Sequence, residues 1–209
     1  MATEALWLNI TEKYSLSENQ LNLFKKYAEF LQKWNEVKNL TSITNLEDII
    51  YYHFEDSLAI SNFIDFNKIN TICDIGTGAG FPGIPLKIKF EHLHVILIEV
   101  NQKKINFLNE LIKELQLENI EVCPLDWRTF LRQTDYQIDL FFARASLQTD
   151  ELLRLFKANS PYQNSQLIYW GSNQWQPTEQ DLIYFKEEKA YKVGSKDRKY
   201  IFFNNKRLF

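Results

Sequence analysis

The sequence contains little glycine, cysteine or histidine, and it contains no long apolar run. Its 209 residues include six glycines, two cysteines and three histidines. No apolar segment approaches the roughly 18 residues that a membrane-spanning helix needs. The first ten residues also lack the basic and apolar regions of a signal peptide. We therefore expect a cytoplasmic protein without a membrane partner, large enough for one sizeable domain and an additional subdomain.

The scarcity of cysteine and histidine also bears on metal binding. Cys73 and Cys123 lie in apolar, strand-like runs. This placement favours two buried free thiols in a reducing compartment, with a disulfide or a metal site as the alternatives. His53, His92 and His94 do not stand at metal-ligand spacing from the cysteines. We expect no metal site.

The charge is close to balanced overall but uneven along the chain. The formal net charge of −3 argues against non-specific binding of nucleic acid over the whole surface. From residue 186 to residue 209, however, eight Lys and Arg residues face only three acidic ones. Such a run is most often a solvated face, although it can also meet phosphates.

The first third of the sequence has helical patterns, and strands then alternate with helices. Capping boxes begin two of the early helices, at Ser17 and Thr44. Helices are predicted at 18–36, 46–53, 56–65, 84–90, 101–116, 149–158 and 178–186, with a helical turn at 126–131. Strands are predicted at 70–75, 94–99, 120–123, 138–142, 167–170, 189–193 and 199–204.

Apolar strands that alternate with helices indicate an α/β fold with a mostly parallel sheet. No helix separates the last two strands, so we expect them to form an antiparallel hairpin at the edge of the sheet. Residues 1–66 are expected to form an N-terminal helical cap, and residues 67–209 a Rossmann-like domain. A ligand in such a fold binds at the carboxyl ends of the strands, near the switch point beside the first strand.

Four of the six glycines, Gly76, Gly78, Gly80 and Gly83, fall within eight residues. They stand between the first predicted strand and a predicted helix, an arrangement with which many α/β folds bind nucleotide-like ligands. Residues 78–83 also match G-x-G-x-x-G, and Glu99 follows about twenty residues later, at the end of the second strand. A dinucleotide such as NAD is therefore one candidate ligand.

Asp74 favours a different ligand. It lies at the end of the first strand, where its carboxylate would repel a pyrophosphate. S-adenosylmethionine has no phosphate and carries two cationic groups, an ammonium and a sulfonium, so it suits a carboxylate at this position. Glu99 would bind its ribose hydroxyls. The alternative is that Asp74 only caps the following turn.

A resemblance to a known family makes the choice of ligand more specific. The segment Asp-Ile-Gly-Thr-Gly-Ala-Gly-Phe-Pro-Gly-Ile-Pro-Leu at 74–86 resembles motif I of the RsmG (GidB) family. These bacterial methyltransferases use S-adenosylmethionine to methylate N7 of a guanine in 16S ribosomal RNA. Further matches keep the family's order and spacing, at 39–44, 53–58, 103–108 and 143–145.

The resemblance implies the class I methyltransferase fold, with S-adenosylmethionine as cofactor and 16S ribosomal RNA or the 30S subunit as partner. Gly76 and Phe81 would line the cofactor pocket, with Gly78 and Gly80 in the same loop. Arg144 would lie at the edge of that pocket.

Three residues of the implied cofactor site differ from those that are usual in the family. Glu99 stands where the family usually has Asp, and it should still bind ribose. Trp127 and Arg128 occupy the pair that flanks the adenine, where a small or apolar residue followed by Glu is more usual. A backbone N–H of this pair could still bind the base.

Two further departures affect the regions expected to touch RNA. Trp170 replaces a lysine that the family typically has at the end of the fifth strand, and the family's basic, proline-containing C-terminal tail is missing. A relative that binds RNA or the ribosome without turnover is therefore one alternative function. A nicotinamide-dependent oxidoreductase is another, although Asp74 and the lack of an evident hydride-relay residue count against it.

The chemistry of guanine N7 methylation needs no general base, because N7 already has an in-plane lone pair. We therefore name no catalytic residue and expect the protein to act by alignment and by exclusion of water. No apolar stripe is left over for a second copy, so we expect a monomer.

Other side chains have two interpretations each. His53 and Asp56 either pair with each other in the interior or lie against the cofactor pocket and lock the helical cap to the sheet. Lys103 and Lys104 are either solvated or contact phosphate. Trp170 and Trp175 either pack in the core or stack on an unpaired base.

Overall fold

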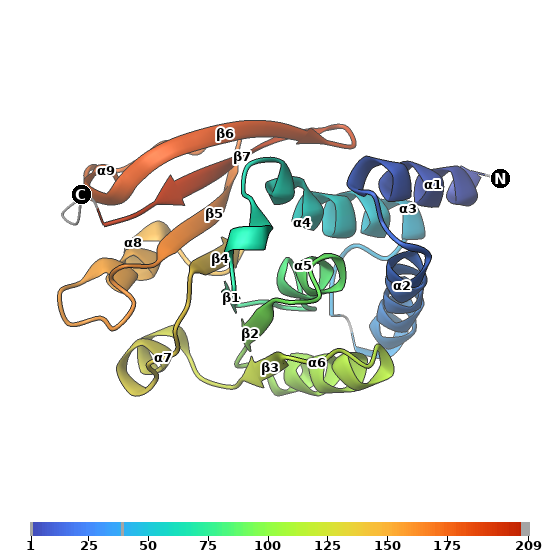
Figure 1. The fold of residues 1–209 in the computed structure, drawn as a ribbon, viewed down its shortest axis with the longest axis horizontal. Coiled ribbons are helices and arrows are strands. Elements are labelled where there is room, and N and C mark those ends of the chain that lie inside the picture. Colours follow the sequence, from blue (N-terminus) through green and yellow to red (C-terminus); the bar gives the residue numbers. More distant parts are fainter. Residues whose placement is uncertain (1, 39, 206–209) are drawn as a thin grey trace.

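The fold is built on one seven-stranded sheet (Figure 1). The computed structural model describes residues 2–38 and 40–205. Asn39, in one of the segments that resemble the family, and the last four residues of the basic C-terminal run lie outside the described part. The strands are β1 (Thr71–Ile75), β2 (His94–Ile98), β3 (Ile120–Cys123), β4 (Leu140–Arg144), β5 (Gln166–Ser172), β6 (Phe185–Val193) and β7 (Lys196–Phe203).

The strand order is β3-β2-β1-β4-β5-β7-β6. The first five strands are parallel to one another. β7 pairs antiparallel with both β5 and β6. The predicted α/β sheet with an antiparallel closing hairpin is therefore confirmed. The chain leaves β1 in one direction and later returns to its other side as β4, which places the switch point between the carboxyl ends of β1 and β4.

The helices of the α/β part are α5 (Gly83–Lys89), α6 (Gln102–Glu114), α7 (Trp127–Gln133), α8 (Thr149–Leu152) with the 3₁₀ turn η4 (Leu153–Phe156), and α9 (Glu179–Tyr184). Three of them, α6, α8 with the turn that follows it, and α9, are shorter than their patterns predict, whereas α5 has the predicted length and α7 is slightly longer. The helix predicted at 178–186 ends early because Phe185 already begins β6.

Alternate residues of the strands face opposite sides of the sheet, as the two-residue period of a strand requires. Ile72, Val95 and Leu97 belong to a core shared with the N-terminal helices, α5 and α6. Cys73, Ile96 and Ile98 belong to a second core with α7, α8 and η4. Cys73 and Cys123 are free, buried thiols, as the sequence predicts.

The N-terminal segment is more helical than predicted. It begins with α1 (Ala2–Tyr14), which the sequence analysis missed, and continues with α2 (Glu18–Lys38). The two helices predicted at 46–53 and 56–65 form one continuous run: α3 (Leu46–Ile49), the π-helix η1 (Ile50–Glu55), α4 (Asp56–Leu58) and the 3₁₀ turn η2 (Ala59–Asn62). A further 3₁₀ turn, η3 (Phe66–Lys68), leads into β1. No helix in the described residues has the length and apolar character that crossing a membrane requires.

Candidate functional site

A pocket of about 300 Å³ lies at the carboxyl ends of the first four strands. The segments after β1, β2, β3 and β4 all contribute to its wall, so it occupies the place where ligands bind in this architecture. The lining residues are Ile75, Gly76, Ile98, Glu99, Val100, Lys104, Leu125, Asp126, Trp127, Ala145, Ser146 and Leu147. Three of the nine predicted cofactor residues, Gly76, Glu99 and Trp127, are among them.

The glycine loop after β1 forms the wall nearest the switch point. Gly76, Gly78 and Gly80 have φ angles of +67°, +65° and +98°, in the left-handed region that favours glycine. At Gly76 a Cβ atom would also lie 2.6 Å from Cβ of Ser146. Gly76 therefore permits both the backbone turn and the close approach of the loop that follows β4.

Asp74 lies below this loop rather than in the pocket wall. Its side chain is buried, and Oδ2 accepts hydrogen bonds from Thr77 Oγ1 at 2.7 Å and from Gly83 N at 2.8 Å. The capping role is therefore observed. Burial outweighs these hydrogen bonds and raises the pKa of Asp74 to about 6. The other oxygen, Oδ1, is buried without a hydrogen-bond partner among the described residues.

Glu99 connects the end of β2 to the glycine loop. Its Oε1 accepts hydrogen bonds from the backbone N–H groups of Val100 and Asn101, both at 2.9 Å. Its Oε2 accepts one from Gly78 N at 3.1 Å and lies 3.9 Å from Nζ of Lys104. The carboxylate is thus held at the pocket by backbone donors on both sides. Lys104 lines the pocket and Lys103 is exposed.

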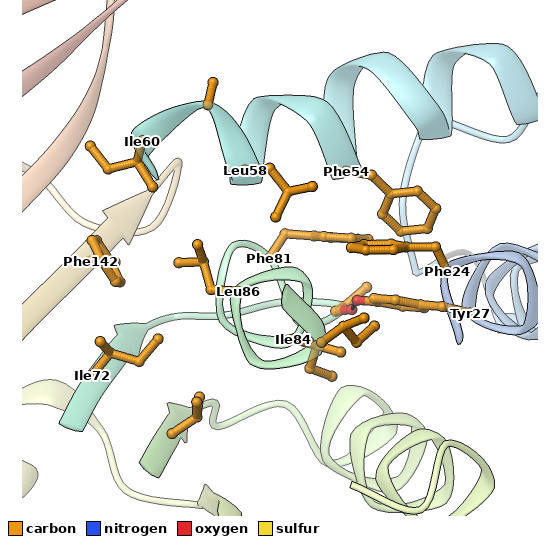
Figure 2. Packing of buried hydrophobic residues seen from close by; sticks show 14 of the residues in the cluster. Phe24, Tyr27, Phe54, Leu58, Ile60, Ile72, Phe81, Ile84, Leu86 and Phe142 are labelled. Atoms are coloured by element: carbon orange, nitrogen blue, oxygen red, sulfur yellow. Dashed lines mark hydrogen bonds between the residues drawn. The ribbon is translucent and has the colours of Figure 1, made fainter. Parts of the chain in front are cut away.

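Phe81 does not line the pocket but anchors the glycine loop to the N-terminal helices. Its ring is stacked between the rings of Tyr27 and His53, with centroid distances of 5.2 and 4.2 Å and interplanar angles of 7° on both sides. Tyr27 also donates a hydrogen bond from its hydroxyl to the carbonyl of Ala79 in the loop. Figure 2 shows Tyr27 reaching Phe81 from α2. Sequence reasoning placed Tyr27 in no site, because only tertiary packing brings α2 to the loop.

Arg144 is the last residue of β4, which continues two residues beyond the end of the strand predicted at 138–142. Its Nη1 donates to Asp56 Oδ2 at 2.8 Å and to the carbonyl of Tyr52 at 3.1 Å, and Nη2 lies 3.1 Å from His53 Nδ1. The guanidinium also lies 5.3 Å from the ring centre of Phe81. Arg144 therefore contacts the helical run and the loop anchor, and it is not among the residues that line the pocket.

His53 is neutral in this arrangement. A guanidinium can only donate, so Nδ1 must accept from Arg144, and the ring proton lies on Nε2, 3.2 Å from Thr41 Oγ1. Burial, and then the positive charge of Arg144, lower the pKa of His53 to about 3. His53 and Asp56 therefore meet through Arg144. Together the three residues lock the helical run to the sheet, as one of the two interpretations predicted. That interpretation also placed His53 and Asp56 against the cofactor pocket, but neither residue lines it.

Asp56 also joins the closing hairpin to this network. Its Oδ1 accepts a hydrogen bond from the Tyr191 hydroxyl at 2.6 Å, and its carbonyl accepts from Tyr200 at 3.1 Å and from Trp170 Nε1 at 3.4 Å. Trp170 is 5% exposed and packs edge-on against neighbouring rings. Of the two interpretations of Trp170, core packing is therefore the observed one. Trp175 is partly buried against the second core.

Trp127 and Arg128, the pair at the start of α7, point to different places. Trp127 is buried, lines the pocket, and donates from Nε1 to the carbonyl of Glu151 at 2.8 Å. Arg128 makes a two-pronged ion pair with the Glu151 carboxylate, at 2.8 and 2.6 Å, and lies outside the pocket lining. This pairing, to which Arg154 adds, lowers the pKa of Glu151 to about 2.

Ser146 is a pocket residue that the sequence analysis missed. Its hydroxyl is buried without a hydrogen-bond partner among the described residues. It follows Ala145, whose φ angle of +51° is unusual for a residue with a side chain. The pattern of hydrophobic residues does not indicate that Ser146 is a pocket residue. Its role follows only from the tertiary structure, which brings it against Gly76. Among the described residues, no group of three or more His, Cys, Asp or Glu side chains could hold a metal ion.

Comparison with known proteins gives the family. The family model for GidB, described as rRNA small subunit methyltransferase G, matches residues 20–202. A ribosomal RNA small subunit methyltransferase G of Lysinibacillus sphaericus is 47% identical over 142 residues, which are 67% of this chain and 60% of that protein. The protein of the same name in Bacillus subtilis is 42% identical over 166 residues, 76% of this chain and 70% of that protein.

The fold also resembles solved methyltransferases at low sequence identity. Magnesium protoporphyrin IX methyltransferase from Synechocystis, solved with bound SAM, superposes with a TM-score of 0.57 at 13% identity, covering 86% of this chain and 97% of that one. This likeness shows the fold alone. The match of the family model over most of the sequence shows more: the chain belongs to the GidB family, rRNA small subunit methyltransferase G.

Proposed function

We propose that this protein transfers the methyl group of S-adenosylmethionine to N7 of a guanine in 16S ribosomal RNA. The observation that carries the proposal is the pocket at the carboxyl ends of β1, β2, β3 and β4, where Glu99 and the glycine loop meet in a chain of this family. The family's curated relatives are named as methyltransferases of small-subunit ribosomal RNA, which supports the class of reaction and of substrate.

The residues present fit S-adenosylmethionine in charge and in hydrogen-bonding capacity. The carboxylate of Glu99 is held at the end of β2, where it can accept hydrogen bonds from ribose hydroxyls. Two buried polar atoms, Asp74 Oδ1 and Ser146 Oγ, are without a partner among the described residues, and Ser146 lines the pocket. Unpartnered buried polar atoms are uncommon, and a polar cofactor in the pocket would supply the missing partner of Ser146.

We assign each predicted cofactor residue a role in keeping with its position. Gly76, Glu99 and Trp127 would contact the cofactor directly, with the Trp127 ring beside the adenine. Asp74 would hold the glycine loop in place from below, through its hydrogen bonds with Thr77 and Gly83.

The remaining predicted residues would act at a distance from the cofactor. Gly78 and Gly80 shape the loop, Phe81 anchors it, and Arg144 holds that anchor in place. Arg128 is directed away from the pocket, so we give it no role at the adenine.

The transfer itself requires alignment more than proton chemistry. The N7 lone pair attacks the methyl carbon, the bond from that carbon to sulfur breaks with its electrons remaining on sulfur, and positive charge moves to the purine. No proton has to leave first, so this chain needs no general base. Its residues bind and orient the reactants and exclude water.

We also propose that residues 1–66 form a helical cap on a methyltransferase domain of residues 67–209, and that the protein is a cytoplasmic monomer whose partner is the 16S RNA or the 30S subunit.

The proposal is tested by calorimetric titration and by label transfer. Titration with S-adenosylmethionine should show binding, whereas titration with NAD should not. Purified protein and S-adenosylmethionine with a labelled methyl group should then label unmethylated 30S subunits or free 16S RNA. Binding of the cofactor without transfer to either RNA would instead favour a relative that has kept the fold and lost turnover.

A further inference from the structure

A second hollow, of about 190 Å³, lies beside the cofactor pocket on the outer side of α7 and η4. We call it the basic hollow, because four of its seven lining residues carry a positive charge and none carries a negative one. The lining residues are Arg128, Leu131, Arg132, Arg154, Lys157, Asn159 and Ser160. In a protein with a formal net charge of −3, this local excess of cations is unusual.

The nearby carboxylates only partly neutralise these cations. Arg128 and Arg154 share the single carboxylate of Glu151, with the Nε of each 2.8 and 3.0 Å from Oε2. Arg132 donates to the hydroxyl of Thr129 at 3.1 Å. Lys157 is exposed at the rim.

Two further acids, Asp126 and Asp150, lie close enough to influence the guanidinium groups, but neither lines the hollow. Asp126 is already engaged, since its carboxylate accepts two hydrogen bonds from Thr129 and caps α7.

The basic hollow and the proposed active site share the first turn of α7. Trp127 and Arg128 are consecutive residues in the first turn of α7; Trp127 lines the cofactor pocket and Arg128 lines the basic hollow. Figure 1 shows α7 and α8 next to each other, on the side of the sheet away from the N-terminal helices. A polynucleotide with one base next to a cofactor bound in that pocket would therefore have its backbone within reach of these side chains.

We infer that the basic hollow binds a phosphate of the RNA backbone next to the methylated nucleotide. This inference rests on the proposed function and adds to it the surface that grips the substrate. Guanidinium groups suit a phosphodiester because their planar N–H groups can donate to two of its oxygens at once. Asn159 and Ser160 add uncharged polar groups to the lining. An RNA is favoured over a free anion because the same turn of α7 also lines the cofactor pocket, next to which the methylated base would lie.

The inference is tested with the double variant Arg132→Gln, Lys157→Gln. It removes two positive charges while leaving the ion pairs of Glu151 intact, so the fold should be preserved. The charge-matched control is Lys33→Gln, Lys38→Gln, which changes two exposed lysines of α2 on the far side of the molecule. Binding of fluorescent 16S RNA fragments is measured by anisotropy at several salt concentrations, S-adenosylmethionine affinity by calorimetry, and methyl transfer with labelled cofactor.

The double variant should bind RNA about five- to tenfold more weakly than the wild type, and the slope of log K against log salt should fall by about 1 to 2. Its affinity for S-adenosylmethionine should be unchanged. The control should match the wild type in all three assays.

Two results would overturn the inference while leaving the proposed function in place. In the first, the wild type methylates the RNA and the double variant binds it with the same affinity and salt slope. In the second, the control loses as much affinity as the double variant, which would indicate a diffuse attraction. A wild-type protein that neither binds nor methylates the RNA would contradict the proposed function itself, and this inference with it.

Discussion

Nη1 of Arg144 lies 2.8 Å from Oδ2 of Asp56, and this ion pair joins the end of β4 to the helical run that precedes β1. The two side chains are 15% and 1% exposed, so the charges are largely removed from water. Asp56 also binds the closing hairpin, and Arg144 also lies against Phe81, the anchor of the glycine loop. One buried pair therefore connects three parts of the protein that meet around the proposed active site.

Replacement of Arg144 by Met should strongly destabilise the protein. The side chain keeps much of its length, but Asp56 loses the nearer of its two cations and keeps only Arg198, whose Nε lies 3.4 Å from Oδ1. Loss of one partner of a buried ion pair costs about 3–5 kcal/mol. Urea unfolding should show a loss of about 3 kcal/mol in the free energy of unfolding. The control is Lys68→Met, which removes an exposed pair with Asp65 and should cost less than about 1 kcal/mol. Equal losses in the two variants would contradict the structural role of Arg144.

Two glycines of the loop offer a matched comparison. Gly76 and Gly78 have nearly equal φ angles, +67° and +65°, so alanine should introduce similar backbone strain of about 1–2 kcal/mol at both. Only at Gly76 does the new Cβ meet a neighbour, Ser146 at 2.6 Å, whereas at Gly78 the space is open. Gly76→Ala should therefore lower stability by about 1–3 kcal/mol more than Gly78→Ala, because overpacking adds to the strain. Thermal unfolding of both variants measures the difference, and equal melting temperatures would argue against the close approach of the two loops.

His53 should make stability depend on pH in a known direction. Its pKa falls from an unfolded value near 6.5 to about 3 in the folded protein, so between these values the unfolded state binds the extra proton. The contribution of His53 to stability is complete above pH 6.5 and is lost as the pH falls toward 3, by about 1.4 kcal/mol per pH unit. As the pH falls from 6.5 to 4.5, the free energy of unfolding of His53→Gln should decrease less than that of the wild type.

Asp74 should make stability depend on pH in the opposite direction to His53. Burial raises its pKa from 3.8 to about 6, so the folded state holds the extra proton in that window. The contribution of Asp74 to stability is complete below pH 3.8 and declines as the pH rises through 6. Urea unfolding of His53→Gln and Asp74→Asn between pH 4.5 and pH 6.5 should therefore shift the pH dependence with opposite signs. A shift of the same sign in both variants would refute one of the two assignments.

Asp74→Ala also tests the cofactor site. We expect the affinity for S-adenosylmethionine to fall at least tenfold, because the variant removes both the acceptor that holds Thr77 and Gly83 and the unpartnered Oδ1. Calorimetric titration measures the change, and circular dichroism checks that the fold is intact. The control is Asp65→Ala, which changes the exposed acid that caps η3. Unchanged affinity in Asp74→Ala would refute the role given to this residue.

The sheet and the glycine loop could be predicted from the sequence because their signals are local. The apolar runs that became β1 and β2, and the cluster of glycines between Gly76 and Gly83, stand within a few residues of one another. The position of Glu99 at the end of β2 followed from the same local pattern. The closing hairpin was also predicted, although β6 begins at Phe185, earlier than its apolar residues indicate.

The contacts that complete the site could not be predicted, because they join residues far apart in the sequence. Arg144 and Asp56 are 88 residues apart, and Tyr27 and Ala79 are 52 apart. The directions of the side chains at the start of α7 could not be predicted either. Trp127 turns inward to the pocket and Arg128 outward to Glu151, although the two are neighbours in the sequence.

The central claim is tested most directly by the product of the reaction. Unmethylated 30S subunits or free 16S RNA are incubated with the protein and S-adenosylmethionine labelled in its methyl group, and the RNA is then digested to nucleosides. We predict that the label appears in 7-methylguanosine, with one methyl group per RNA molecule at completion. Label on another atom or another base, or binding of the cofactor with no label on either RNA, would contradict the account.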